Sequence, residues 1–174
     1  MRSGHICLGK DGKGAAHPIE GLQRVFCTID PAASAREGPG DKDIWRKQPS
    51  FTVISTFGLT VDYNLVWLDM RRFRKEIPDI LQEVRDVYKK WTPQYFICES
   101  SGLGKGAFQM IAQCGLPVRS VHPHHDKLVR ATDAMNRMQQ GKIWLPQTAG
   151  WLHDCEKELF SWTAHPHQSD DIID

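Results

Sequence analysis

Two short apolar segments that each end in a single acidic residue constrain the fold of this chain most. Residues 25–29 are followed by Asp30, and residues 95–98 are followed by Glu99. Apolar runs of this length are typical of buried strands. A carboxylate at the end of such a strand projects from the rim of a sheet, where it can meet the ends of other strands. The pattern therefore predicts a sheet that carries acidic side chains along one rim.

A third acidic group lies at the end of the sequence. Asp170, Asp171 and Asp174 fall within the last five residues, and on a helix they would lie within about 100° of one another. Like charges on one narrow face repel unless a cation or a basic group joins them. Such oxygen ligands suit Mg²⁺ or Mn²⁺, and paired hard cations promote phosphodiester hydrolysis. The same acids would also suit the solvated first turn of a helix, so both interpretations stay open.

The apolar periodicity between these acids predicts a mixed α/β sheet. Three strands with hairpin connections come first, and helices then alternate with strands, which favours parallel pairing in the second half. Strands are expected at about 24–30, 51–57, 65–70, 95–99 and 118–121, with an extended piece at 143–146. Helices are expected at about 77–91, 105–113, 126–139 and 148–160.

Composition limits the class of protein. The chain has 174 residues, enough for one domain, which we place at residues 24–174 after a flexible tail or linker at 1–23 with five glycines. With 22 basic and 21 acidic residues, net charge does not favour a nucleic-acid partner. No apolar run is long enough to span a membrane. The five cysteines include no CxxC pair, which favours a reducing cytoplasm.

The helix expected at 126–139 carries the clearest basic stripe. Lys127, Arg130 and Arg137 lie within about 80° of one another, opposite a face with Leu128 and Met135 that is expected to be buried, together with Ala131 and Met138. The stripe is either a solvated face or a track for phosphates. A denser basic run at 71–75 is expected to be a solvated turn.

Several segments, in order, resemble the nuclease domain of phage terminase large subunits. They are residues 30–32, 96–99, 126–131, 141–146, 151–159 and 169–174. The resemblance covers roughly residues 24–174. It implies a ribonuclease H-like fold, with three antiparallel strands, then parallel strands, and helices on the sides. In that fold the first and fourth strands are adjacent and parallel.

The resemblance also implies a site with two divalent cations, Mg²⁺ or Mn²⁺. The implied catalytic residues are Asp30, Glu99 and Asp171, and the implied metal ligands are these three and Asp174. One cation, held by Asp30 and Asp171, would activate water. The second, held by Asp30 and Glu99 about 4 Å away, would stabilise the leaving oxygen. Asp170 and His167 are candidates for supporting positions beside the ligands.

The function that the resemblance implies is a metal-dependent DNA endonuclease that cuts concatemeric viral DNA during genome packaging. The implied partners are double-stranded DNA and, in a full terminase, the ATPase domain, the small subunit and the portal, in the cytoplasm of a bacterial host. No Gly-Lys pair is followed by Ser or Thr, so no Walker A motif is present. The C-terminal helix is expected to be truncated, as in an excised domain or a broken prophage gene. A resolvase-like nuclease on branched DNA and an inactive prophage remnant that only binds DNA remain alternatives.

Overall fold

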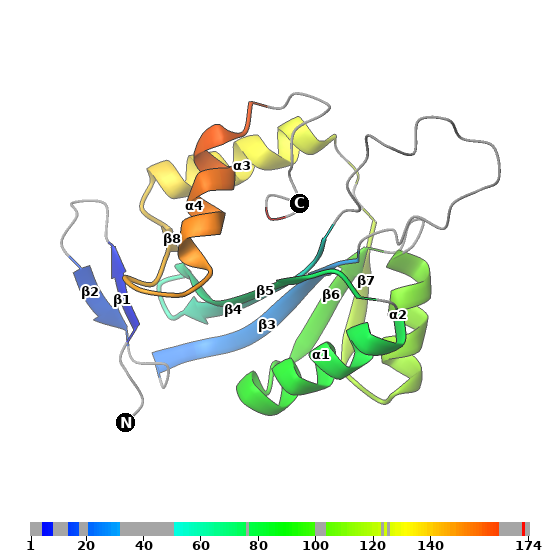
Figure 1. The fold of residues 1–174 in the computed structure, drawn as a ribbon. Helices are drawn as coiled ribbons and strands as arrows, with labels where there is room; N and C mark the ends of the chain where they lie inside the picture. Colours follow the sequence, from blue (N-terminus) through cyan, green and yellow to red (C-terminus); the bar gives the residue numbers. More distant parts are fainter. Residues whose placement is uncertain are drawn as a thin grey trace.

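A six-stranded mixed sheet organises the chain (Figure 1). The computed structural model describes residues 5–8, 14–17, 21–31, 51–75, 77–99, 104–122, 124, 126–163 and 172. Strands β3 (Leu22–Asp30), β4 (Thr52–Thr60) and β5 (Leu65–Phe73) are antiparallel. Strands β6 (Tyr95–Glu99) and β7 (Val118–Val121) continue the sheet parallel to β3, and β8 (Ile143–Trp144) pairs parallel with β5. The predicted fold class is confirmed, including the parallel pairing of β3 with β6.

Four helices cover the two faces of this sheet within the described residues. They are α1 (Ile77–Trp91), α2 (Gly104–Gln113), α3 (Lys127–Gln139) and α4 (Leu152–Ser161). Helices α1 and α2 lie on one side of the sheet, and α3 and α4 lie on the other (Figure 1). The α1 bounds match the prediction, whereas α4 begins four residues later than expected. None of the described helices is both long and apolar enough to cross a membrane.

The segment expected to be a tail or linker contains a hairpin that the sequence analysis did not predict. Strand β1 (His5–Leu8) pairs antiparallel with β2 (Gly14–His17), from His5 opposite His17 to Leu8 opposite Gly14. Each segment is only four residues long, and β2 consists mostly of small residues, so the pair carries little of the alternation that indicates a strand. The role of residues 1–23 as a tail or linker stays a prediction.

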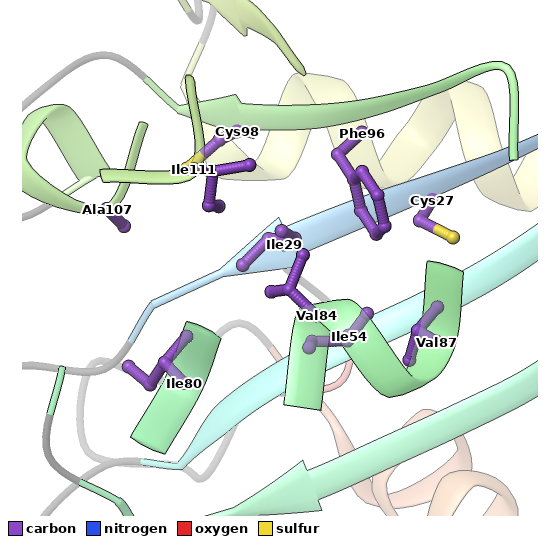
Figure 2. Packing of buried hydrophobic residues seen from close by; sticks show 10 residues of the cluster. All are labelled: Cys27, Ile29, Ile54, Ile80, Val84, Val87, Phe96, Cys98, Ala107 and Ile111. Carbon is purple, nitrogen blue, oxygen red and sulfur yellow. The ribbon is translucent and has the colours of Figure 1, made fainter. Parts of the chain in front are cut away.

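The larger core lies between the sheet and helices α1 and α2 (Figure 2). Alternate residues of a strand point to the same face, and on this face Ile29 and Cys98 are buried at 3% and 0% exposure. Val84 of α1 is fully buried against them. Full burial of an aliphatic side chain contributes roughly 1.5–3 kcal/mol. The remaining buried members are Cys27, Ile54, Ile80, Val87, Phe96, Ala107 and Ile111.

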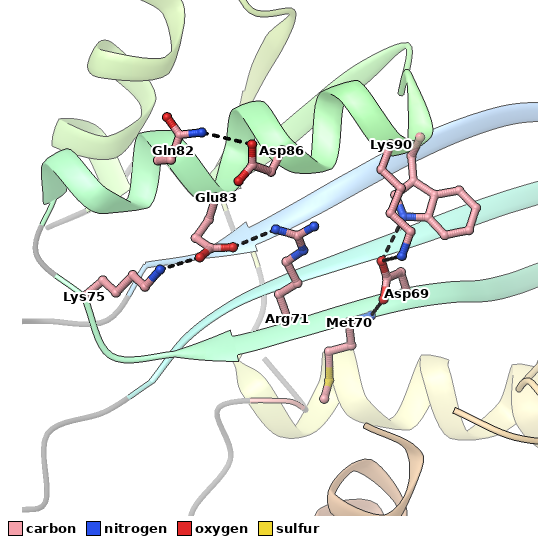
Figure 3. Close-up of polar contacts among 9 residues, drawn as sticks. Asp69, Met70, Arg71, Lys75, Gln82, Glu83, Asp86 and Lys90 are labelled. Carbon is pink, nitrogen blue, oxygen red and sulfur yellow. Dashed lines mark hydrogen bonds and ion pairs between the residues drawn. The ribbon is translucent and has the colours of Figure 1, made fainter. Parts of the chain in front are cut away.

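Polar contacts also fasten α1 to β5 (Figure 3). Glu83 accepts a hydrogen bond from Arg71 Nη1 at 2.7 Å and another from Lys75. Asp69 accepts from Lys90 Nζ at 2.7 Å and from Trp91 Nε1 at 2.9 Å. The expectation of a solvated turn at 71–75 is therefore wrong. β5 extends to Phe73, and its two arginines are paired because the strand lies between Glu83 of α1 and Glu158 of α4.

A smaller cluster lies on the opposite face, under α4. Val53, Trp67 and Met70 of the sheet are buried there with Cys155 of α4 and with Ile172. The Trp67 and Trp151 rings are 5.4 Å apart between centroids. Ile172 is 7% exposed, so the described part of the C-terminal segment packs against the sheet.

Helix α3 does not bury the face that its periodicity predicted. Leu128 is 58% exposed and Met135 is 53% exposed, and none of the α3 residues is buried. Periodicity shows that one side of a helix is apolar, but it does not show that another element covers that side. The helix ends themselves are well defined. Asp126 Oδ1 accepts from Val129 N at 2.9 Å at the N-terminus, and Gly141 follows the C-terminus with φ of 68°.

Candidate active site

Asp30 and Glu99 occupy equivalent positions at the ends of two adjacent parallel strands. Ile29 of β3 is opposite Cys98 of β6, so the next residue on each strand is one of the two acids. Adjacent strands are about 4.8 Å apart. The structure therefore brings these two predicted residues together, from backbone positions about one strand spacing apart.

Both acids face the α4 side of the sheet. Their neighbours Ile29 and Cys98 belong to the core under α1 and α2, and successive side chains on a strand alternate between faces. Across the sheet, Asp30 is opposite Val53, and Val53 is opposite Arg72. Four residues thus form a line across the strands on this face, which we call the transverse row: Glu99, Asp30, Val53 and Arg72.

The electrostatics of Cys98 support this placement of the two acids. Burial, followed by the negative charges of Asp30 and Glu99, raises the pKa of the Cys98 thiol to about 11. Both carboxylates therefore lie close enough to one sulfur atom to affect it. The thiol, which donates to the Gly104 carbonyl at 3.6 Å, stays protonated at neutral pH. The donors at this site are oxygen atoms, and these suit a hard divalent cation.

The glycine-rich segment after Glu99 has a steric role. Gly104 is the first residue of α2, and a Cβ atom there would lie 2.0 Å from the carbonyl oxygen of Glu99. Atoms cannot approach so closely, so only glycine lets α2 begin against this strand end. α2 therefore supports the backbone that carries the Glu99 carboxylate.

The C-terminal candidates Asp170, Asp171, Asp174 and His167 lie outside the described residues. Their neighbour Ile172 is described, and it packs in the cluster that contains Val53, next to Asp30 in the transverse row. Asp171 precedes Ile172 in the sequence, and its role at the site stays a prediction. Among the described residues alone, no three His, Cys, Asp or Glu side chains gather into a metal-binding group.

The sequence analysis missed Glu158, which lies beside the transverse row, and assigned its partner Arg72 to a solvated turn. Glu158 of α4 is only 6% exposed, and its Oε1 accepts a hydrogen bond from the Ile172 amide at 2.5 Å. Its Oε2 lies 3.5 Å from Arg72 Nη2. One signal was available, because Glu158 follows Cys155 by three residues and shares its buried side of the helix. An acid on the apolar face of a helix usually has a specific partner.

The basic candidates lie on α3, on the α4 side of the sheet (Figure 1). Arg130 and Arg137 are exposed, and Lys127 is half-buried. Their surface is therefore accessible to a large ligand that approaches this face. Their role in DNA binding stays a prediction.

Comparisons with known proteins identify the architecture. No protein-family model matches the sequence, and no curated protein matches it significantly. Crystal structures of the large terminase nuclease from thermophilic phage G20c do match. The form with bound zinc is 16% identical, covers 86% of this chain and 75% of that chain, and has a TM-score of 0.54. The forms with bound magnesium and bound cobalt are each 13% identical, cover 86% of this chain and 77% of that chain, and have TM-scores of 0.56 and 0.55.

At identities of 13–16% the similarity establishes the fold but not the roles of individual residues. In this chain β3 lies between the antiparallel β4 and the parallel β6. The chain therefore has the mixed-sheet, ribonuclease H-like fold of the phage large terminase nuclease.

Proposed function

We propose that this chain is a metal-dependent nuclease domain of terminase type that cuts double-stranded DNA. The observation that carries the proposal is the position of Asp30 and Glu99 at neighbouring strand ends, on the face where Ile172 packs. The similar G20c structures contain magnesium, cobalt or zinc. They support a role for divalent cations in proteins of this fold.

The residues of the site fit two hard cations, Mg²⁺ or Mn²⁺. Asp30, Glu99 and Asp171 would hold them, with Asp174 as a further ligand and with Asp170 and His167 beside it. When bound, such cations activate a water molecule for attack and stabilise the leaving 3′ oxygen. The contribution of the protein is placement. Strands β3 and β6 fix the backbone of two ligands, and α2 packs against the second.

The substrate would reach the site from the α3 side. Lys127, Arg130 and Arg137 would contact phosphates, which supplies affinity that does not depend on sequence. In a packaging enzyme the cleavage site would be chosen by partners, namely the ATPase domain, the small subunit and the portal. We place the reaction in the infected bacterial cell, on concatemeric phage DNA.

The test is cleavage of supercoiled plasmid DNA with Mn²⁺, by the wild-type chain and by Asp30→Asn. We expect the variant to cleave more than roughly 100-fold more slowly. Even residues that only support a metal ligand contribute roughly 10- to 100-fold to metal affinity or activity. Mn²⁺ should also raise the melting temperature of the wild type, since it relieves repulsion between carboxylates. That rise should be much smaller in Asp30→Asn.

Asp62→Asn is a matched control, because Asp62 is exposed in the turn between β4 and β5, at the other end of the sheet. It should cleave and respond to Mn²⁺ like the wild type. Equal cleavage by Asp30→Asn and wild type would refute the proposed site. A strong preference for four-way junctions over linear duplex, by a dimer, would favour a resolvase-like nuclease instead. Metal-independent DNA binding without any cleavage would favour an inactive remnant.

A further inference from the structure

A buried carboxylate with no place in the proposed chemistry lies beside the site. Glu158 is 6% exposed, and it contacts two groups on the α4 face of the sheet. Its Oε1 accepts from the Ile172 amide at 2.5 Å, and its Oε2 lies 3.5 Å from Arg72 Nη2. Removing a carboxylate from water is unfavourable unless charged or hydrogen-bonding partners replace the water. The Arg72 guanidinium and the Ile172 amide are partners of these two kinds.

The amide that Glu158 accepts from belongs to the peptide unit between Asp171 and Ile172. The six atoms of a peptide unit lie in one plane, and the Cα atom of the preceding residue is one of them. A hydrogen bond to the Ile172 N–H therefore restrains the peptide unit that joins Ile172 to the residue before it. The contact acts on the backbone of a proposed metal ligand, one bond away from its side chain.

The transverse row shows where this peptide unit is held. Ile172 packs in one cluster with Val53, which is opposite Asp30 on one side and opposite Arg72 on the other. Glu158 contacts both Arg72 and the Ile172 amide. Ile172 thus packs one strand away from Asp30, with its side chain in the cluster of Val53 and its amide bonded to Glu158 of α4.

We propose that Glu158 is a positioning residue, which holds the peptide unit of Asp171 so that the Asp171 carboxylate meets that of Asp30 around a divalent cation. The inference rests on the proposed metal site. Glu158 itself does not bind the cation, because its two oxygen atoms face the Ile172 amide and Arg72. Partners behind a metal ligand commonly account for 10- to 100-fold in metal affinity.

The experiment measures Mn²⁺ binding by isothermal titration calorimetry in the absence of DNA, for the wild type and three variants. Glu158→Ala removes the acceptor, and we expect the Kd for Mn²⁺ to rise by about 10-fold or more. Glu158→Gln keeps an oxygen acceptor for the Ile172 amide, so it should restore most of the affinity. Glu156→Gln is the control, because Glu156 lies about 200° around α4 from Glu158 and should bind Mn²⁺ like the wild type.

Amide hydrogen exchange of the C-terminal peptide gives a second readout, without metal or substrate. Glu158→Ala should lose protection at Ile172, whereas Glu158→Gln should keep most of it. If Glu158→Ala does not fold, Ile172→Pro removes the same hydrogen bond from its donor side, since proline has no N–H. It should raise the Kd for Mn²⁺ by a similar factor.

Asp30→Asn separates the two proposals. If it abolishes Mn²⁺ binding while Glu158→Ala and Ile172→Pro bind like the wild type, the metal site stands and the positioning role of Glu158 is refuted. If Asp30→Asn binds Mn²⁺ as tightly as the wild type, the inference fails together with the proposed function. Loss of affinity in Glu158→Ala with recovery in Glu158→Gln supports both.

Discussion

At the scale of single residues, the geometry of the site depends on Gly104, which has no side chain to collide with the end of β6. Gly104→Ala would place a Cβ atom 2.0 Å from the Glu99 carbonyl oxygen, so the start of α2 or the end of β6 must move. We expect this variant to have a lower melting temperature and weaker Mn²⁺ binding. Calorimetric titration and thermal unfolding measure the two effects.

Gly106→Ala is the matched control on the same helix. No atom lies within 4 Å of a Cβ at this position, and replacing glycine by alanine inside a helix stabilises it by about 0.5–1 kcal/mol. Its melting temperature should rise and its Mn²⁺ affinity should not change. Similar behaviour of the two alanine variants would show that Gly104 has no special steric role.

The site residues that were predicted are marked by their local sequence, whereas the residue that was missed is defined by a contact between distant elements. Asp30 and Glu99 were recognisable because each follows an apolar run, and the end of a strand is visible in the sequence. The contact of Glu158 with Arg72 joins a helix and a strand far apart in the chain. It depends on which element covers which face of the sheet, and periodicity does not contain that information.

At the scale of elements, α1 is attached to β5 by charges as well as by its apolar face. The hydrogen bond from Lys75, followed by that from Arg71, holds the pKa of Glu83 below its usual value of 4.5. A carboxyl with a lowered pKa stabilises the folded state above the unfolded pKa and loses that contribution as pH falls through the folded pKa. Glu83→Gln should therefore be less stable than the wild type by about 1–2 kcal/mol at pH 7, and the difference should shrink below about pH 4.5.

Urea unfolding at pH 7 and at pH 3 measures this difference. Asp86→Asn is the control, because the described partner of Asp86 is the neutral Gln82 amide at 2.9 Å. Its stability relative to the wild type should change little between the two pH values. A gap for Glu83→Gln that is equally large at pH 3 would show that packing, and not charge, attaches this part of α1.

Helix α3 is the element whose bounds were predicted well and whose packing was not. Its start and end are marked locally, by the Asp126 cap and by Gly141. Its apolar side, in contrast, is exposed at Leu128, Val129 and Met135. Local sequence determines where a helix begins and ends, but burial requires a partner element.

The exposed basic side of α3 leads to a prediction about DNA. Arg130→Ala or Arg137→Ala should weaken binding to every duplex alike, and each lost phosphate contact should reduce the slope of log affinity against log salt by about 0.9. Fluorescence anisotropy over a salt series measures both. Arg85→Ala is the control, because it removes the same positive charge from an exposed residue of α1, on the opposite side of the sheet. If Arg130→Ala binds DNA normally but does not cleave it, Arg130 acts at the carboxylates instead.

At the scale of the whole molecule, one face of the sheet carries the larger core and the other carries the proposed site. Among the described residues, the core cluster between the sheet and helices α1 and α2 has ten buried members, and the cluster under α4 has five, including Ile172. The class of fold was predictable, because strand and helix periodicities alternate clearly between residues 52 and 121, and the resemblance to terminase nucleases implied that the first and fourth strands are adjacent. The difference between the two faces was not predictable, since it depends on the packing of Ile172 against Val53 of β4.

This division predicts that two similar core substitutions will have different consequences. Val84 of α1 is fully buried against the sheet, and Val53 is 4% exposed in the transverse row beside Asp30. Replacing either by alanine removes the same two methyl groups and should lower stability by roughly 1–3 kcal/mol. Only Val53→Ala also loosens the contact with Ile172, so only this variant should bind Mn²⁺ more weakly. Calorimetric titration below the melting range of both variants measures the difference, and equal Mn²⁺ affinity in the two would show that the α4 face does not organise the metal site.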